Sequence, residues 1–267
     1  MSPDPSSLVA LERYPILDLS SSRAAELISQ CRSDIRRNGM AVLPRFVHHE
    51  MLPAMAAEAE KLSTGSYHQD LLGTPYLEVP GEHWPMDHPR LAFGRSALTA
   101  IPYDVFPENS ALRSLYEWDS LLKFIQAALG LDALYRYADP LSALNVAAMH
   151  DGDELAWHFD QTDFVVSLAL QRPLSGGEFV CAPLVRSPDN ENYEMVASCL
   201  NDDDGAPIIV VPFEPGSLML FEGRNSLHRV NKISGPIARH VALLGYDRLP
   251  EQHGSELLKT IRYGRTT

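Results

Sequence analysis

Hydrophobic positions in the first half of the chain recur mostly at helical spacing. Ser21 or Ser22 can cap the first helix, and Asn38-Gly39 supplies a left-handed stop. A short apolar run directly after that stop has the length of a strand. The pattern predicts helices over 22–37, 49–62 and 111–129 and a strand over 40–43.

An irregular stretch separates the second and third of these helices. It runs from Thr74 to Pro89 and contains four prolines, which stiffen the backbone and remove hydrogen-bond donors. A loop of this length is either functional or disordered.

From about Leu141 the pattern changes to short apolar runs separated by turn residues such as Ser175-Gly176-Gly177 and Pro215-Gly216. A helix expected over 191–200 interrupts them. Many short strands with this spacing indicate a sandwich or a barrel. The expected strands cover 143–149, 164–171, 178–181, 208–211, 217–221 and 238–246.

Composition and charge narrow the possible roles. A length of 267 residues suits one large domain, and the formal charge of -13 disfavours a nucleic-acid partner, because such partners usually bind a basic face. No apolar run is long enough to span a membrane, and the first residues lack the features of a signal peptide, so we expect a cytoplasmic protein. The three cysteines are far apart and show neither disulfide nor zinc spacing.

A candidate metal site begins at Trp157-His158-Phe159-Asp160. Residues i and i+2 of an extended chain point to the same face, so His158 and Asp160 can converge on one ion. His228, 68 residues later, supplies a third ligand. Two imidazoles and one carboxylate on one side of a six-coordinate ion leave three positions open, an arrangement typical of oxygen-activating iron(II).

Arg239 strengthens this interpretation. It follows His228 by 11 residues and lies within an apolar strand, where a buried guanidinium requires an anion. The distal carboxylate of 2-oxoglutarate is one suitable anion. A buried ion pair with an Asp or Glu is the alternative.

With these residues in place, the sequence resembles the iron(II)/2-oxoglutarate-dependent dioxygenases. Their core is a double-stranded β-helix that carries His-x-Asp, a distal His and a basic residue shortly after it. The sequence is more narrowly similar to the free-amino-acid radical halogenases and their hydroxylase relatives. That likeness rests on Asp139-Pro-Leu-Ser-Ala-Leu-Asn-Val146, Trp157-His-Phe-Asp160, Gly176-Gly-Glu-Phe179, Glu191-Asn-Tyr193, Gly223-Arg-Asn-Ser-Leu-His-Arg-Val230, Asp87-His-Pro-Arg90 and Tyr103-Asp104.

The resemblance implies an enzyme that uses iron(II), 2-oxoglutarate and dioxygen to hydroxylate an unactivated C–H bond, releasing succinate and CO2. The halogenases of the group carry Gly or Ala where this chain has Asp160, and chloride takes the vacated position. Asp160 therefore favours a hydroxylase. Desaturation, cyclisation and halogenation remain alternative outcomes of the same chemistry.

For the fold, the resemblance implies an α+β chain with a mainly β core, a jelly-roll or cupin-like double-stranded β-helix with N-terminal helices packed on it. We expect one domain over 1–267. Its parts are a mainly helical N-terminal region with substrate loops (1–135), the β-helix core (136–249) and a C-terminal tail (250–267).

Several further residues are candidates for binding. Asn145, in a strand before the metal loop, contacts 2-oxoglutarate or substrate, or is a satisfied structural amide. Trp157 is expected either to line the pocket for 2-oxoglutarate or to belong to the hydrophobic core. Arg95, with Arg90 as the competing candidate, binds a substrate carboxylate or is a loop arginine on the surface, and Gln161 beside the metal motif faces the substrate.

The expected substrate is a small molecule, a free amino acid or a related carboxylate, with no nucleic acid or membrane as partner. Two other classes compete: a cupin-type metal enzyme that does not use 2-oxoglutarate, and a non-catalytic binding module on a β-sandwich. Arg239 argues against the cupin-type enzyme, because only an enzyme with an oxoacid cosubstrate needs a cationic side chain to bind the distal carboxylate. The sequence leaves the oligomeric state open.

Overall fold

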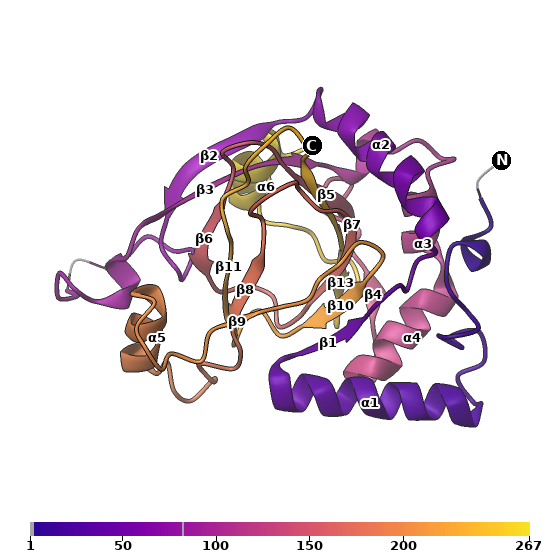
Figure 1. Cartoon of the computed structure of the whole chain (residues 1–267), viewed down its shortest axis with the longest axis horizontal. Helices are drawn as coiled ribbons and strands as arrows, with labels where there is room; N and C mark the ends of the chain where they lie inside the picture. Colours follow the sequence, from indigo (N-terminus) through magenta and orange to yellow (C-terminus); the bar gives the residue numbers. More distant parts are fainter. Residues whose placement is uncertain (1–2, 82) are drawn as a thin grey trace.

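The centre of the computed structural model, which describes residues 3–81 and 83–267, is an 11-stranded sheet that curls round on itself (Figure 1). Its strands are β1 (Met40–Leu43), β2 (His68–Gly73), β3 (Gly94–Ile101), β5 (Leu144–Met149), β6 (Leu155–His158), β7 (Val165–Gln171), β8 (Phe179–Ala182), β9 (Ile209–Val210), β10 (Leu218–Phe221), β11 (Leu227–Val230) and β12 (Arg239–Leu244). A second, two-stranded sheet pairs β4 (Tyr135–Arg136) with β13 (Tyr246–Asp247).

The pairing order brings distant parts of the sequence together. Hydrogen-bonded neighbours follow β1-β10-β7-β12-β5-β3-β6-β11-β8-β9, and β2 pairs with β3 outside this path. All pairings between these strands are antiparallel. Strand β6 therefore lies against β11, and β5 lies against β12, which places both halves of the predicted metal motif in one region.

Side chains alternate between two environments along the central strands. In β5, Leu144 and Val146 pack into the main hydrophobic core, whereas Asn145 and Ala147 line a cavity. Successive residues of a strand point to opposite faces, so one face of the sheet packs on helices and the other forms the cavity wall.

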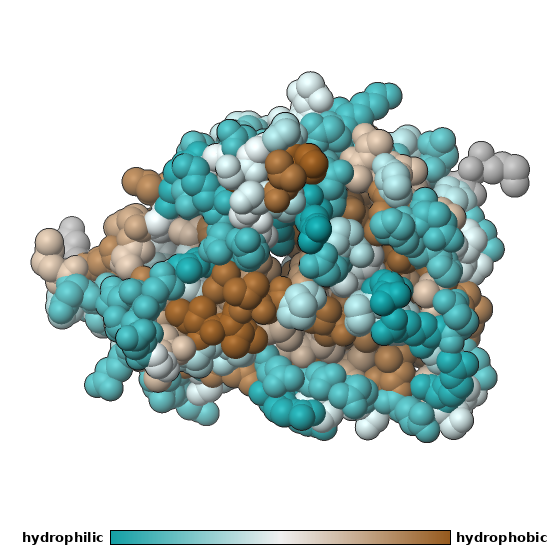
Figure 2. Space-filling view, in the orientation of Figure 1, coloured by the Kyte–Doolittle hydropathy of each residue, from teal (hydrophilic) through white to brown (hydrophobic). Residues whose placement is uncertain are grey.

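Helices cover the outer, core-forming face of the sheet (Figure 1). Cys31 and Ile35 of the first helix are buried in this core, while the outward side of that helix is polar (Figure 2). The helices are α1 (Ser22–Asn38), α2 (Leu52–Ser63), α3 (Ala111–Glu117), α4 (Asp119–Leu129), α5 (Tyr193–Leu200) and α6 (Glu256–Tyr263), with 3-10 turns at Pro5–Ser7, His49–Met51, Pro89–Leu91 and Tyr103–Val105.

The predicted helix over 111–129 is two helices, α3 and α4. Trp118 between them has an extended backbone (φ -75°, ψ 120°), and its side chain packs against the main core. The hydrophobic periodicity continues across the break, which is why the sequence does not reveal it. Helix α1 has the predicted limits, with Ser21 at its N-cap and Gly39 in the left-handed conformation at its end.

Strands β2 and β3 do not appear in the sequence interpretation, which treated the first half as helical after one early strand. Strand β3 lies in the middle of the sheet, between β5 and β6. Its residues Ala97–Ile101 are buried, yet the segment follows an irregular, Pro-rich loop and contains few of the β-branched and aromatic residues that are typical of strands.

Residues 250–267, expected as a C-terminal tail, contain helix α6. The Ser255 side chain accepts a hydrogen bond from the Leu258 amide, and Gly264 ends the helix in the left-handed conformation. Helix α6 packs on β2 and β3. No helix among residues 3–81 and 83–267 combines the length and the apolar character that crossing a membrane requires.

Candidate active site

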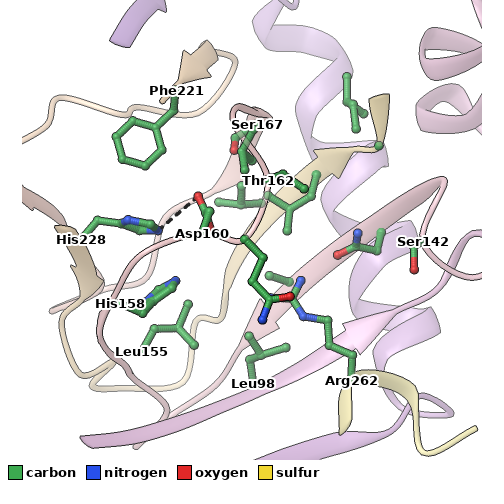
Figure 3. A pocket seen from close by; sticks show the side chains of 18 of the residues that line it. Leu98, Ser142, Leu155, His158, Asp160, Thr162, Ser167, Phe221, His228 and Arg262 are labelled. Carbon is green, nitrogen blue, oxygen red and sulfur yellow. Dashed lines mark ion pairs between the residues drawn. The ribbon is translucent and has the colours of Figure 1, made fainter. Parts of the chain in front are cut away.

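A cavity of about 290 Å³ lies on the inner face of the curled sheet. Strands β5, β6, β7, β11 and β12 contribute side chains to its wall, and α6 contributes others from the C-terminus. Figure 3 shows His158, Asp160 and His228 together on one side of this cavity.

His158, Asp160 and His228 form the group in the described part of the chain that could hold a metal ion, with one donor atom from each lying within 4.8 Å of the others. His158 and His228 face each other directly across β6 and β11, and their ring centroids are 4.2 Å apart. The Asp160 Oδ2 lies 3.6 Å from the His228 Nε2. The structure thus brings together the three predicted ligands.

Backbone carbonyls orient both imidazoles. The Nδ1 of His158 lies 2.8 Å from the Ala156 oxygen, and the Nδ1 of His228 lies 2.9 Å from the Ser226 oxygen. With the proton assigned to Nδ1, each ring donates to its carbonyl and leaves Nε2 free as a metal ligand.

The electrostatics of the site favour a neutral His158. Burial lowers its pKa to about 4, and the neighbouring His228 contributes in the same direction, with a smaller contribution from Arg262. Asp160 and the Ala156 carbonyl oppose this shift. Because only a neutral imidazole coordinates a metal, His158 is ready to act as a ligand at neutral pH.

Gly223 makes room for the Asp160 carboxylate. The Gly223 carbonyl accepts a hydrogen bond from the Asp160 amide at 3.0 Å. A Cβ atom at position 223 would lie 1.7 Å from the Asp160 Oδ2, closer than any real contact. The carboxylate therefore keeps this position only beside a residue without a side chain.

Arg239 lies in the interior, on the cavity wall, as the sequence predicts. Its residue exposure is 8%, and burial lowers its pKa to about 10. Its guanidinium makes no ion pair with any residue of the described ranges, and its one polar contact is the Met149 sulfur at 4.0 Å. The alternative of a buried ion pair with Asp or Glu is therefore absent from the described part of the chain.

Asn145 also faces the cavity. Its Oδ1 is buried and has no hydrogen-bond partner among the described residues. Because buried amides are normally paired, this oxygen has bonding capacity for a molecule in the cavity. Trp157 points to the opposite face, where it packs beside Phe159 and Val180 and under the Arg229 guanidinium, and it does not line the cavity.

Of the predicted substrate residues, Gln161 lies in the cavity wall and Arg95 lies outside it. Gln161 lines the cavity and donates to the Leu77 carbonyl at 3.3 Å. Arg95 does not line it, because its guanidinium pairs with Asp70 at 2.8 Å and with Glu154 at 3.4 Å. Arg90, the competing candidate, is also outside the wall.

Arg262 of α6 is a cavity residue that the sequence interpretation missed. In Figure 3 its side chain extends from the C-terminal helix into the cavity, near Leu98. The cap residues of α6, Ser255 and Gly264, were a signal that a helix forms there, but the position of that helix depends on the folded sheet.

Comparison with known proteins identifies relatives. A sequence profile described as Halogenase D matches residues 92–257, more than half of the chain. The search of curated protein sequences found no significant match to this chain.

Solved structures share the fold. The epimerase SnoN from nogalamycin biosynthesis, described as non-heme and alpha-ketoglutarate-dependent, is 15% identical, covers 83% of each chain and has a TM-score of 0.56. AviO1 from Streptomyces viridochromogenes Tue57 is 16% identical over 82% of this chain and 93% of its own, with a TM-score of 0.55. EctD from S. alaskensis, solved with 2-oxoglutarate and 5-hydroxyectoine, is 17% identical over 82% of this chain and 75% of its own, with a TM-score of 0.52. The predicted jelly-roll fold is thereby confirmed.

Proposed function

The chain belongs to the Halogenase D family, within the iron(II)/2-oxoglutarate-dependent oxygenases, and from this premise we propose that it hydroxylates an unactivated C–H bond of a small carboxylate. The observation that carries the proposal is the cluster of His158, Asp160 and His228, whose donor atoms lie within 4.8 Å of one another. A free amino acid or a related carboxylate is the substrate class.

The residues present suit both groups that the family uses. Two imidazoles and a carboxylate form the donor set that suits iron(II), and Arg239 offers a buried fork of donors to the distal carboxylate of 2-oxoglutarate. The unsatisfied Oδ1 of Asn145 marks a further polar position on the same wall.

When bound, iron(II) with 2-oxoglutarate and dioxygen supplies the oxidising power that replaces a C–H hydrogen by a hydroxyl group, with release of succinate and CO2. The chain's own residues bind and orient. His158, Asp160 and His228 hold the metal, Arg239 fixes the cosubstrate, and apolar side chains such as Leu155, Phe179 and Phe221 limit water in the cavity. No side chain is required as an acid or base for the C–H step.

Asp160 favours hydroxylation over halogenation. The halogenases that the sequence resembles have Gly or Ala at this position and bind chloride there, whereas the Asp160 carboxylate lies 3.6 Å from the His228 Nε2, where a third protein ligand would be. We expect product with one added oxygen atom and no chlorine, even in a buffer rich in chloride.

The first test is substitution of a ligand. Loading the protein with iron(II) under anaerobic conditions and measuring bound iron should give one ion per chain, and His228→Ala should weaken binding by more than about 100-fold, because two protein ligands hold a labile ion poorly. Succinate formation should fall with it.

His49→Ala, which changes an exposed histidine at the start of a 3-10 turn, is the matched control and should behave like the wild type. Wild-type iron content and turnover in His228→Ala would contradict the assignment. Mass analysis of products from a panel of amino acids and other carboxylates then separates hydroxylation from halogenation.

A further inference from the structure

A second arginine lies in the cavity and has no assigned partner. Among the described residues, Arg239 and Arg262 are the basic side chains that line the cavity. Arg262 is partly buried and forms no hydrogen bond or ion pair with any residue in 3–81 or 83–267. It lies in α6, beyond residues 92–257 that match the family profile.

The surroundings of Arg262 are mostly apolar. In Figure 3, Leu155 lies beside His158 and Leu98 lies between Leu155 and the Arg262 side chain, and Leu258 lines the cavity from one turn earlier in α6. Ser142 is a further, polar residue of the cavity wall. A ligand that reaches from the metal to Arg262 therefore places apolar atoms in the middle and an anionic group at its end.

The charges of the loaded cavity point to the same kind of molecule. Iron(II) and the two arginines together carry four positive charges, whereas Asp160 and 2-oxoglutarate carry three negative ones. One positive charge remains uncompensated, and a buried charge without a counter-ion is costly. A substrate with a single negative charge restores the balance.

The cavity offers no acidic partner for an ammonium group. Asp160 is the acidic residue among the described side chains of the wall, and its carboxylate belongs to the metal site. A zwitterionic amino acid would place its ammonium group in a positively charged environment. Such an environment disfavours an additional cation.

We propose that Arg262 binds the carboxylate of the substrate, and that the substrate is a monocarboxylate with an apolar body and no free ammonium group. This inference rests on the proposed function and narrows its substrate class. Arg95 and Arg90 are less suited to the role, because carboxylates of the chain already occupy their guanidinium donors.

Binding measurements test the inference without turnover. The protein loaded with iron(II) and 2-oxoglutarate is titrated anaerobically, by calorimetry, with sets of three compounds of the same carbon skeleton. Each set contains an apolar carboxylic acid, its primary amide and its 2-amino acid, for example 4-methylpentanoate, its amide and leucine, and skeletons of graded length follow. We expect the acid to bind at least about 10-fold more tightly than the other two, because charge-assisted hydrogen bonds are the stronger ones.

Arg262→Gln should weaken binding of the acid by about 10- to 100-fold and remove its advantage over the amide. Arg265→Gln is the matched control. Arg265 lies just past the same helix and pairs with Asp104 away from the cavity, so the change should leave the affinities unaltered.

The outcomes separate this inference from the proposed function. A wild-type protein that fails to bind 2-oxoglutarate in the presence of iron(II) would overturn the proposed function. Normal 2-oxoglutarate binding with equal affinity for acids in wild type and Arg262→Gln would overturn the role of Arg262 alone. Tighter binding of amides or 2-amino acids than of the acids, across all skeletons, would overturn the substrate class.

Discussion

Arg239 shows at the scale of one residue how the cavity is prepared for an anion. The residue is 8% exposed, its guanidinium has no acidic partner in the described ranges, and burial alone lowers its pKa to about 10. At neutral pH the side chain remains charged. An uncompensated internal charge is unfavourable until an anion binds, so part of the affinity for 2-oxoglutarate comes from relieving this state.

We predict that Arg239→Ala weakens 2-oxoglutarate binding by about 10- to 100-fold while iron binding changes by less than about threefold, because the lost contact is a charge-assisted one remote from the ligands. The 2-oxoglutarate affinity of Arg239→Lys should lie between those of the wild type and Arg239→Ala, since an ammonium group keeps the charge and loses the planar fork. Anaerobic calorimetric titration of the iron-loaded proteins measures both effects.

Arg37→Ala is the control for this experiment. Arg37 is an exposed arginine of α1 whose partner, Asp34, lies on the same helix. Its substitution should leave the 2-oxoglutarate affinity unchanged. If Arg239→Ala binds 2-oxoglutarate as tightly as the wild type does, Arg239 does not bind the cosubstrate.

The individual site residues differ in how far the sequence predicts them. The period of two along a strand places His158 and Asp160 on one face, and an arginine in an apolar strand is rare enough to draw attention to Arg239. The roles of Arg95 and Arg262 depend on which acidic residues lie nearby in the folded chain. Asp70 and Glu154 form ion pairs with Arg95, and nothing in the local sequence indicates this pairing.

At the scale of elements, Arg90 connects the irregular loop before β3 to helix α5. Its Nε donates to the Tyr193 hydroxyl at 2.9 Å, and its other nitrogens pair with Glu78 and Glu191. The guanidinium also lies over the Tyr76 ring, 4.2 Å from the centroid. One side chain thus holds a Pro-rich segment on a helix more than 100 residues away in sequence.

We predict that Arg90→Lys increases amide hydrogen exchange in 74–81 and 83–91 by about 5- to 30-fold. A single ammonium group cannot reproduce the stacked, forked contacts, and a loss of 1–2 kcal/mol in local stability changes the open population by this factor. Exchange followed by mass spectrometry on peptides from these segments gives the measurement.

Arg172→Lys, an exposed change elsewhere, serves as the comparison and should not alter exchange in this loop. Strand β12 provides an internal reference, because its exchange should be the same in all variants. Equal exchange of the loop in Arg90→Lys and wild type would show that other contacts hold it.

Elements with strong local signals are predicted well, and those defined by the sheet are not. Helix α1 has a serine cap and a glycine stop, so its limits follow from local chemistry. Strand β3 contains few β-branched or aromatic residues and gains its stability from β5 and β6, which lie far ahead in sequence. Helix α6 carries caps, but its place beside β2 and β3 is a tertiary feature.

At the scale of the whole molecule, the cavity is built from segments that are distant in sequence. Strands β5, β6, β7, β11 and β12 and helix α6 all contribute to its wall. The unfolded chain does not assemble this site. Ligands that bind there therefore stabilise the folded state, and once in excess they do so in proportion to the logarithm of their concentration relative to the dissociation constant.

We predict that iron(II) and 2-oxoglutarate together, each at about 100 times its dissociation constant, raise the melting temperature by roughly 10–20 °C. Each of the two ligands contributes about 2.7 kcal/mol at that excess, and a chain of this size gains about 2–4 °C per kcal/mol. Anaerobic differential scanning calorimetry with and without the two ligands provides the measurement.

The same ligands should leave the melting temperature of His228→Ala nearly unchanged, and a chelator should return the wild type to its ligand-free value. An equal rise in His228→Ala would indicate that the ligands bind elsewhere. The cavity wall carries Arg239 and Arg262 in a chain with a formal charge of -13, so high salt should screen their attraction for anionic ligands and reduce the ligand-induced rise.

The contact between Gly223 and Asp160 restricts which pairs of residues positions 160 and 223 can carry together. With a carboxylate at position 160, a Cβ atom at position 223 would collide with it, so we expect aspartate at 160 to be accompanied by glycine at 223. Loss of the carboxylate, as in the chloride-binding members of the group, removes the constraint and allows position 223 to drift. The order of events then matters, because a lineage that has filled position 223 cannot regain an aspartate at 160 by a single reversal.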